Sequence, residues 1–242
     1  YALNIAARAC FFEILINDVP VFSMEIPGQV GPMIPINFAI LKTGTQDLTA
    51  KILPLPGESK LNEAASLLFN LQLFDVFNDE FKLIESFEEE RAVKEEDAGN
   101  APLVVYKSQF FAQIPYQMKS WEEGINLKDV EKADEKLKNA YNVIGKLIGE
   151  KKFSEFSVVL QDRETNMAKA LYLNQASQKA RINSLIEDAN TGFQIMPLSP
   201  DATMRTYGFG KLASLKKLNG EPALFLYNYE TNEELMIDLM FY

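Results

Sequence analysis

The sequence predicts a β-rich protein in which an N-terminal antiparallel β-sandwich is followed by an α+β domain. Three observations predict it. Apolar side chains recur at every second position in the first half, at steps of three and four residues after about residue 125, and again at every second position after Gly192. A period of two is typical of a half-buried strand, and a period of 3.6 is typical of an amphipathic helix. We therefore expect a β-sandwich domain over residues 1–120 and an α+β domain over residues 126–242.

The first strand of the sandwich ends in a predicted turn at Asn17-Asp18. Before this turn, alternate residues form one apolar face: Cys10, Phe12, Ile14 and Ile16. Asn and Asp both tolerate left-handed backbone angles, so a tight turn between two strands explains the pair. The alternative is a calcium-binding loop at the tip of a sandwich. No D-x-D-x-D-G pattern accompanies the pair, which favours the turn.

Four more segments of the first half alternate in the same way. They are QDLTAKILP (46–54), FNLQLF (69–74), FKLIESF (81–87) and LVVYKSQFFAQIPY (103–116). Short alternating strands separated by glycine, proline and asparagine turns are typical of antiparallel sandwiches. The charged run EEERAVKEED (88–97) is expected to be a solvated loop that protects a sheet edge.

Three helices are predicted next. Asn126 and Asp129 have the spacing of a helix-capping box. One apolar stripe follows: Val130, Ala133, Leu137, Tyr141, Ile144 and Ile148. A second helix is indicated by Phe153, Phe156, Leu160, Met167 and Leu171. A third is expected from near Ser177 to Gly192, where a left-handed helix cap fits.

The segments after Gly192 predict a meandering antiparallel sheet. Asn219-Gly220 is a strong hairpin turn signal within it. Three helices followed by a curved antiparallel sheet resemble NTF2-like and cystatin-like cones in the order of their elements. This resemblance implies a cone-like sheet for residues 126–242. It includes no motif, so it assigns no functional residue.

Composition excludes several classes of function. The net charge is −10, from 34 acidic and 24 basic residues, which disfavours nucleic acid and anionic lipid as partners. The chain contains no histidine, which excludes Ser-His-Asp and Cys-His catalytic sites and histidine-based metal sites. We expect no metal and no cofactor. No run approaches the ~20 apolar residues of a membrane-spanning helix.

The cysteine content and the first residue bear on the cellular compartment of the protein. Cys10 is the only cysteine, so no disulfide can form within the chain, and its place in a strand pattern predicts a buried thiol. The chain starts at Tyr1 rather than Met. We interpret this start as a removed export signal, which predicts a periplasmic, cell-envelope or secreted protein. A lipid anchor upstream of residue 1 is an alternative form of the same interpretation.

Four residues are candidates for ligand binding. Arg163 falls on the predicted core side of the second helix, so it either extends to water or binds an anion at the mouth of a pocket. Asp238 lies among Met and aromatic side chains, either as a general base or at the rim of an interface. Tyr227 would orient an anionic substrate, and Arg205 could join either site. No catalytic residue is predicted.

These observations favour a non-enzymatic binding or assembly protein. Its partner is expected to be a protein, with a glycan as the second choice, because the outer face of the last strands is rich in aromatic residues and Met. The alternative is a small-molecule-binding enzyme or ligand-binding protein with a pocket in the α+β domain. That alternative requires Arg163 and Asp238 to share one pocket. The alternation of the last strand places them on opposite sides of the sheet.

Overall fold

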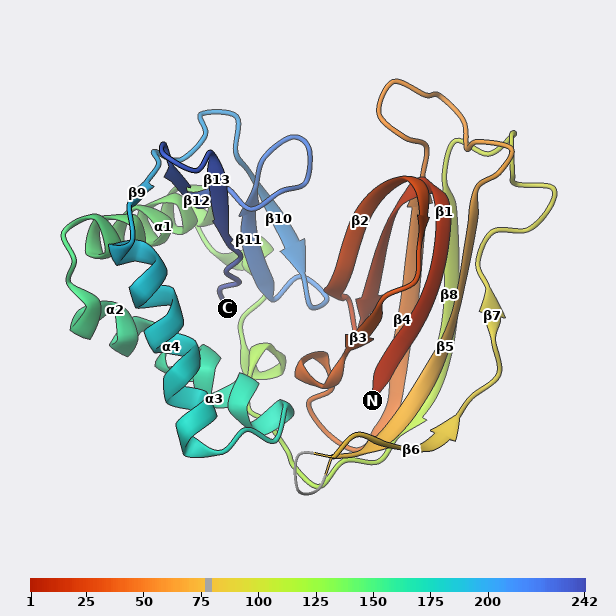
Figure 1. The fold of residues 1–242 in the computed structure, drawn as a ribbon, viewed down its shortest axis with the longest axis horizontal. Coiled ribbons are helices and arrows are strands. Elements are labelled where there is room, and N and C mark those ends of the chain that lie inside the picture. The colour runs from red at the N-terminus through yellow and green to blue at the C-terminus, as the bar shows by residue number, and fades with distance from the viewer. Residues whose placement is uncertain (77–79) are drawn as a thin grey trace. The chain divides into compact units, whose positions relative to one another are not determined.

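The computed structural model describes residues 1–76 and 80–242 (Figure 1). The chain divides into two compact units, Tyr1–Met118 and Lys119–Tyr242. In the described residues, the first unit is built from strands and one short 3₁₀ turn, Asn37–Ala39. The second unit contains four α-helices and five short strands. The predicted fold class, a β-rich protein with an α+β second half, is confirmed.

The first unit contains one large antiparallel sheet. Its strands are β1 (Ala2–Ile16), β2 (Val19–Val30), β3 (Met33–Pro35), β4 (Gly44–Leu53), β5 (Ser66–Asp75), β6 (Lys82–Ser86), β7 (Glu90–Arg91) and β8 (Val104–Ala112). The central strand is β1, which pairs with β2 and β3 along one edge. Along its other edge it pairs first with β5 and then with β4. The two layers expected of a sandwich are therefore two parts of a single sheet that share β1.

The sheet curls at Ala9. Here the register of β1 against β2 shifts, φ is +50°, and the partner on the other edge changes from β5 to β4. A bulge of this kind bends a strand and increases its twist. The bend lets β5 and β8 face each other, and the rings of Phe69 and Tyr106 lie 5.9 Å apart. Cys10 follows directly and is buried, as predicted.

The predicted turn at Asn17-Asp18 is confirmed. Both residues have positive φ, 51° and 61°, and they join β1 to β2. The Asn17 amide donates to Ala39 O at 2.9 Å and to Gln46 Oε1 at 2.8 Å, and its Oδ1 accepts from the backbone N–H of Asp47. Asn17 thus ties the turn to two neighbouring segments, and the tight turn accounts for the pair.

The helices of the second unit differ in two ways from the prediction. They are α1 (Ala133–Gly149), α2 (Phe153–Val159), α3 (Gln161–Ala170) and α4 (Gln175–Asn190). Asn126 caps only the 3₁₀ turn Leu127–Asp129, because the backbone is extended again at Val130. The predicted second helix is divided at Leu160, which ends α2 and begins α3.

The strands of the second unit form two small sheets instead of one meander. β10 (Thr203–Tyr207) pairs with β11 (Leu212–Lys216), while β12 (Leu224–Asn228) lies between β9 (Phe193–Ile195) and β13 (Glu233–Ile237). Isolated bridges, Ala213 to Phe241 and Lys216 to Pro222, connect them. The resemblance implied one continuous cone-like sheet. The structure instead has two sheets, which are separated between β11 and the segment that follows β13.

The helices cover one face of these strands (Figure 1). Their buried residues meet alternate residues of β11, β12 and the last segment in one apolar core. It contains Leu137, Tyr141, Ile144, Ile148, Phe156, Leu160, Ala202, Ala213, Leu215, Ala223, Leu224, Leu226, Ile237 and Leu239. Residues that alternate with these strand positions point away from the core. On β12 these residues, Phe225 and Tyr227, are half-buried, whereas on β11 Ser214 and Lys216 are buried as well.

Candidate functional sites

The outer face of the β9–β12–β13 sheet gathers aromatic and methionine side chains. We call it the aromatic face, and it consists of Phe225, Tyr227, Tyr229, Met196 and Met236. Leu224, Leu226 and Asn228 alternate with the aromatic residues of β12 and are buried. Tyr229 is 60% exposed and Met236 is 40% exposed. The predicted aromatic- and Met-rich outer face is present.

Contacts within the aromatic face hold its side chains in place. The rings of Tyr227 and Tyr229 meet edge to face at 4.8 Å, and the Tyr229 hydroxyl lies 3.7 Å from Met196 Sδ. Lys217 Nζ lies 4.1 Å from the centre of the Phe225 ring, a cation–π contact. The Tyr227 hydroxyl donates to Asn232 Oδ1 at 3.0 Å. Little rotamer freedom therefore remains to be lost when a partner covers this surface.

Acidic residues border the aromatic face. Glu230, Glu233 and Glu234 are exposed at the β12–β13 turn and in β13. Glu234 pairs directly with Tyr227 across the two strands, so it lies on the same face. Glu233 accepts from the Thr231 hydroxyl, at 2.8 Å. The surface therefore combines an aromatic centre with a negatively charged edge.

Asp238 lies outside this face, in a polar cluster next to β11. Its Oδ2 accepts from Lys216 Nζ at 2.8 Å, and its Oδ1 accepts from the Ser214 hydroxyl at 3.4 Å. Lys216 is largely buried, whereas the Asp238 side chain is 45% exposed. Arg205 pairs across the strands with Ser214 and is exposed. Arg205 thus occupies the strand position opposite Ser214 of this cluster, in which Lys216 pairs with the Asp238 carboxylate.

The Tyr141 hydroxyl explains why the sheet is interrupted beside this cluster. It donates to Leu239 O at 2.8 Å and accepts from the Leu215 backbone N–H at 3.1 Å. Those two groups would bond directly if the pairing of Ala213 with Phe241 continued along both segments. Burial is the largest effect on the pKa of this phenol and raises it. Tyr141 therefore replaces one rung of the ladder with its own hydroxyl.

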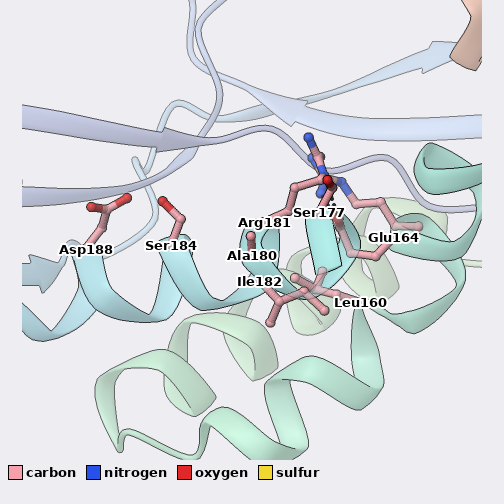
Figure 2. Close-up of a pocket in the computed structure, with 9 residues that line it drawn as sticks. Leu160, Glu164, Ser177, Ala180, Arg181, Ile182, Ser184 and Asp188 are labelled. Carbon is pink, nitrogen blue, oxygen red and sulfur yellow. Dashed lines mark hydrogen bonds and ion pairs between the residues drawn. The ribbon is translucent and has the colours of Figure 1, made fainter. Parts of the chain in front are cut away.

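Arg163 lines a groove between α3 and α4 (Figure 2). The groove has a volume of about 570 Å³, and its lining consists of Leu160, Arg163, Glu164, Ser177, Ala180, Arg181, Ile182, Ser184 and Asp188. Glu164 is buried at one end and accepts from Arg163 Nη1 and from Arg181 Nε, the latter at 3.0 Å. Arg163 of α3 and Arg181 of α4 thus share the Glu164 carboxylate.

The prediction placed Arg163 on the core side of its helix, and the structure places Glu164 there. The helix break at Leu160 shifts the phase of the stripe by one residue, so that Glu164 and Ala168 are buried in place of Arg163 and Met167. Periodicity along an assumed continuous helix could not have found this shift. Arg181 and Glu164 were missed because only the packing of α3 against α4 makes them neighbours.

The four predicted residues occupy three different places. Arg163 lies in the helical groove, Tyr227 on the aromatic face, and Asp238 and Arg205 at the polar cluster. Asp238 lies between Ile237 and Leu239, both of which face the core that the helices cover. Arg163 and Asp238 are therefore on opposite sides of the strands, and the geometry offers them no common pocket.

Comparisons with known proteins leave the chain without an assigned family. No protein-family model, no curated protein and no solved structure matches it. Within residues 1–76 and 80–242, no three His, Cys, Asp or Glu residues gather as a metal site would need. In the same part of the chain, no helix has both the length and the apolar character required to cross a membrane.

Proposed function

We propose that this protein is a non-enzymatic binding protein whose aromatic face binds a basic protein partner. The observation that carries the proposal is the composition of that face: ordered Phe, Tyr and Met side chains bordered by glutamates. Aromatic residues and Met are enriched in protein interfaces, and Tyr is frequent among the residues that dominate binding energy. Acidic borders favour a partner with lysine or arginine around its own apolar contact.

The net charge of the chain supports the same partner. At −10, the whole molecule attracts a basic protein and repels an acidic one. Long-range attraction of this kind speeds association and weakens as salt rises. The proposed complex should therefore form fastest at low ionic strength.

The placement of the predicted residues favours binding over catalysis. An enzyme using Asp238, Arg163 and Tyr227 together would need them around one substrate, and they lie at three separate places. Lys216 pairs with the carboxylate that would have to act as the base. A role in binding requires only that the aromatic face be accessible, and Tyr229 and Met236 are exposed.

Affinity capture with matched variants tests this proposal. The immobilised full chain is exposed to an extract of its source cells at low salt, in parallel with the double variant Tyr229→Ser/Met236→Ser. The control is Val143→Ser/Val158→Ser, which removes two exposed apolar side chains from α1 and α2. Captured proteins are quantified by mass spectrometry, and the most enriched one is then purified for a binding titration.

We expect a basic protein to be retained by the wild type and by the helix control. The aromatic-face variant should lose it, with at least about a tenfold weaker Kd in the titration, since substitution of an interface hot spot costs 2 kcal/mol or more. Retention of the same proteins by all three chains, or a partner that is acidic, would contradict the proposal.

A further inference from the structure

Strand β8 is an edge of the large sheet in the first unit, and the proposed protein-binding role does not use it. It pairs with β4 along its whole length without a shift in register, and within residues 1–76 and 80–242 no other strand pairs with it. Apart from the ladder with β4, no backbone group of β8 has a hydrogen bond in this part of the chain. A regular edge of this kind presents a row of free N–H and C=O groups, on which another strand can pair.

The other edge strands of this sheet have features that hinder such pairing. β2 contains Pro20 and Pro27, which lack a backbone donor, and the charged Glu25 lies between them. β3, β6 and β7 have five residues or fewer. By contrast, β8 contains no proline and no acidic residue, and Lys107 is its only charged side chain. Among these edges, β8 is therefore the one least protected against the addition of a strand.

The exposed side chains of β8 have an apolar residue toward each end and polar residues between. Val105 is 49% exposed and Phe111 is 61% exposed, and both belong to the same alternating set as Lys107 and Gln109. Alternate residues of a strand share one face of the sheet, so these four lie in a row along it. The same order of apolar, polar, polar and apolar residues is read in either direction along the strand.

A second copy of β8 therefore fits this edge in the reverse direction. With a twofold axis at Ser108, every residue of the strand gains a partner across the axis. Val105 then lies opposite Phe111 of the second copy, and Lys107 lies opposite Gln109 of the second copy. A register shifted to place the axis at Lys107 would bring two like charges together, which destabilises a strand pair.

Charges across this register are complementary. Asp47 of β4 lies opposite Gln109 of the same chain and accepts from its side-chain amide at 2.7 Å. In the paired arrangement, Lys107 of one copy lies in one row with Gln109 and Asp47 of the other. Neighbouring strands are about 4.8 Å apart, so the long lysine side chain can extend over Gln109 toward the carboxylate. The twofold axis produces this contact twice.

We propose that two copies of this chain associate by antiparallel pairing of their β8 strands, with the twofold axis at Ser108. Backbone hydrogen bonds join the two large sheets into one. Contacts between Val105 and Phe111 remove apolar surface from water, and the rows of Lys107 and Asp47 select the register. A single pair of strands is a small interface, so the dimer dissociates on dilution. The aromatic face uses other residues, so either association can be present without the other.

Sedimentation equilibrium of the full chain, at concentrations up to about 200 μM, tests the pairing. We expect the wild type to form a reversible dimer. Lys107→Glu should raise the dimer Kd about tenfold, since both rows then hold two carboxylates, and Lys107→Glu/Asp47→Lys should recover most of the affinity. The matched control is Lys60→Glu, the same charge change at an exposed position outside the strands, and it should leave the Kd unchanged. A wild type that stays monomeric, or equal effects of Lys107→Glu and Lys60→Glu, would overturn the proposal.

Cysteine substitutions locate the axis. Ser108→Cys places two thiols directly opposite each other, with about 4.5–5.5 Å between the Cα atoms, which a disulfide can span. Val105→Cys is the control, because its two copies would lie six residues apart along the paired strands, about 20 Å. Cys10 is buried and is present in both variants.

Under mild oxidation, we expect a disulfide-linked dimer from Ser108→Cys and none from Val105→Cys. Equal cross-linking of the two variants, or none in Ser108→Cys, would reject this register. Tyr229→Ser/Met236→Ser should dimerise like the wild type, which separates this test from that of the proposed function.

Discussion

At the scale of the residue, single polar side chains complete backbone pairing that the strands leave open. Tyr141 is the clearest case, because its buried hydroxyl stands between Leu215 N and Leu239 O. A buried N–H or C=O without a partner costs about 1–3 kcal/mol. The side chain also contacts the ring of Phe241, at 5.3 Å between centroids. One tyrosine thus stabilises the C-terminal segment through both its hydroxyl and its ring.

Tyr141→Phe should lower the free energy of unfolding by about 1–3 kcal/mol, because the ring is kept while the bridge between the two backbone groups is lost. Urea denaturation followed by circular dichroism measures this loss. Tyr229→Phe is the matched control, since it removes an exposed hydroxyl, and it should change stability by less than about 0.5 kcal/mol. An equal loss of unfolding free energy in the two variants would show that the Tyr141 hydroxyl does not stabilise the protein by bridging the two backbone groups.

Cys10 makes a prediction about pH. Burial raises the pKa of its thiol from 9.0 to about 11, against a smaller lowering by a backbone hydrogen bond from Arg8. Between these two values the folded state holds the proton more firmly than the unfolded state does. The contribution to stability is therefore complete below pH 9 and is lost as the pH rises through about 11. Between pH 9 and 11, the urea midpoint should fall more steeply with pH for the wild type than for Cys10→Ala. If the two midpoints fall equally with pH, the raised pKa of the Cys10 thiol is contradicted.

At the scale of the element, the Asn17-Asp18 turn joins the two longest strands and anchors them to β4. Its positive φ angles follow from residue types that tolerate the left-handed region. Sequence was sufficient to predict this turn, because turn chemistry is local. The three hydrogen bonds of the Asn17 side chain were not predictable, since Ala39, Gln46 and Asp47 approach it only in the folded sheet.

A pair of substitutions separates the two contributions of Asn17. Asn17→Gly keeps the backbone angle at little cost and removes the side-chain hydrogen bonds, whereas Asn17→Ala removes both. We expect Asn17→Gly to lower the free energy of unfolding by about 1–2 kcal/mol, and Asn17→Ala to lower it by about 1 kcal/mol more. Thermal and urea unfolding measure both values. Wild-type stability in Asn17→Gly would show that the side-chain bonds contribute nothing.

The helices show where sequence periodicity is insufficient. The stripe of α1 was largely predictable because the helix is continuous, and four of its six predicted members are buried: Leu137, Tyr141, Ile144 and Ile148. Val130 precedes the helix, and Ala133, its first residue, is half-buried. The break at Leu160 has no proline or glycine to announce it, so the phase of α3 could not be predicted. The helical groove depends on that phase. Its two arginines, on α3 and α4, could be brought together only by tertiary packing.

At the scale of the whole molecule, the change of period near residue 125 corresponds to a change from an all-strand unit to one with helices. Alternation predicted β1, β4, β5, β6 and β8 but could not predict that β1 serves both layers. The prediction of a solvated loop over residues 88–97 was wrong in part, because Glu90–Arg91 pairs with β5 as β7 and the following Ala92 and Val93 are buried. Similarly, the last apolar segments predicted strands but not the division into two small sheets. Phe225, Tyr227 and Met236 of the aromatic face were predictable from alternation along β12 and β13. Met196 was not, since it joins the face only because the segment after β9 bonds to the backbone of Phe225.

Each unit contains the residues of its own core, so the two should fold separately. Residues 1–118 and 119–242, produced alone, should each give a cooperative unfolding transition and dispersed amide resonances. Their circular dichroism spectra should sum to that of the full chain. A unit that remains unfolded alone would show that its stability requires the other.

Methionine oxidation tests the proposed binding surface most directly. Met236 lies on the aromatic face, and Met33, in the first unit, is 51% exposed and serves as an internal control. The full chain is treated with dilute peroxide, alone and saturated with the partner that affinity capture identifies, and both sulfoxides are followed by mass spectrometry. We predict that the partner slows oxidation of Met236 several-fold and leaves that of Met33 unchanged. An unchanged rate at Met236 in the saturated complex would contradict the account.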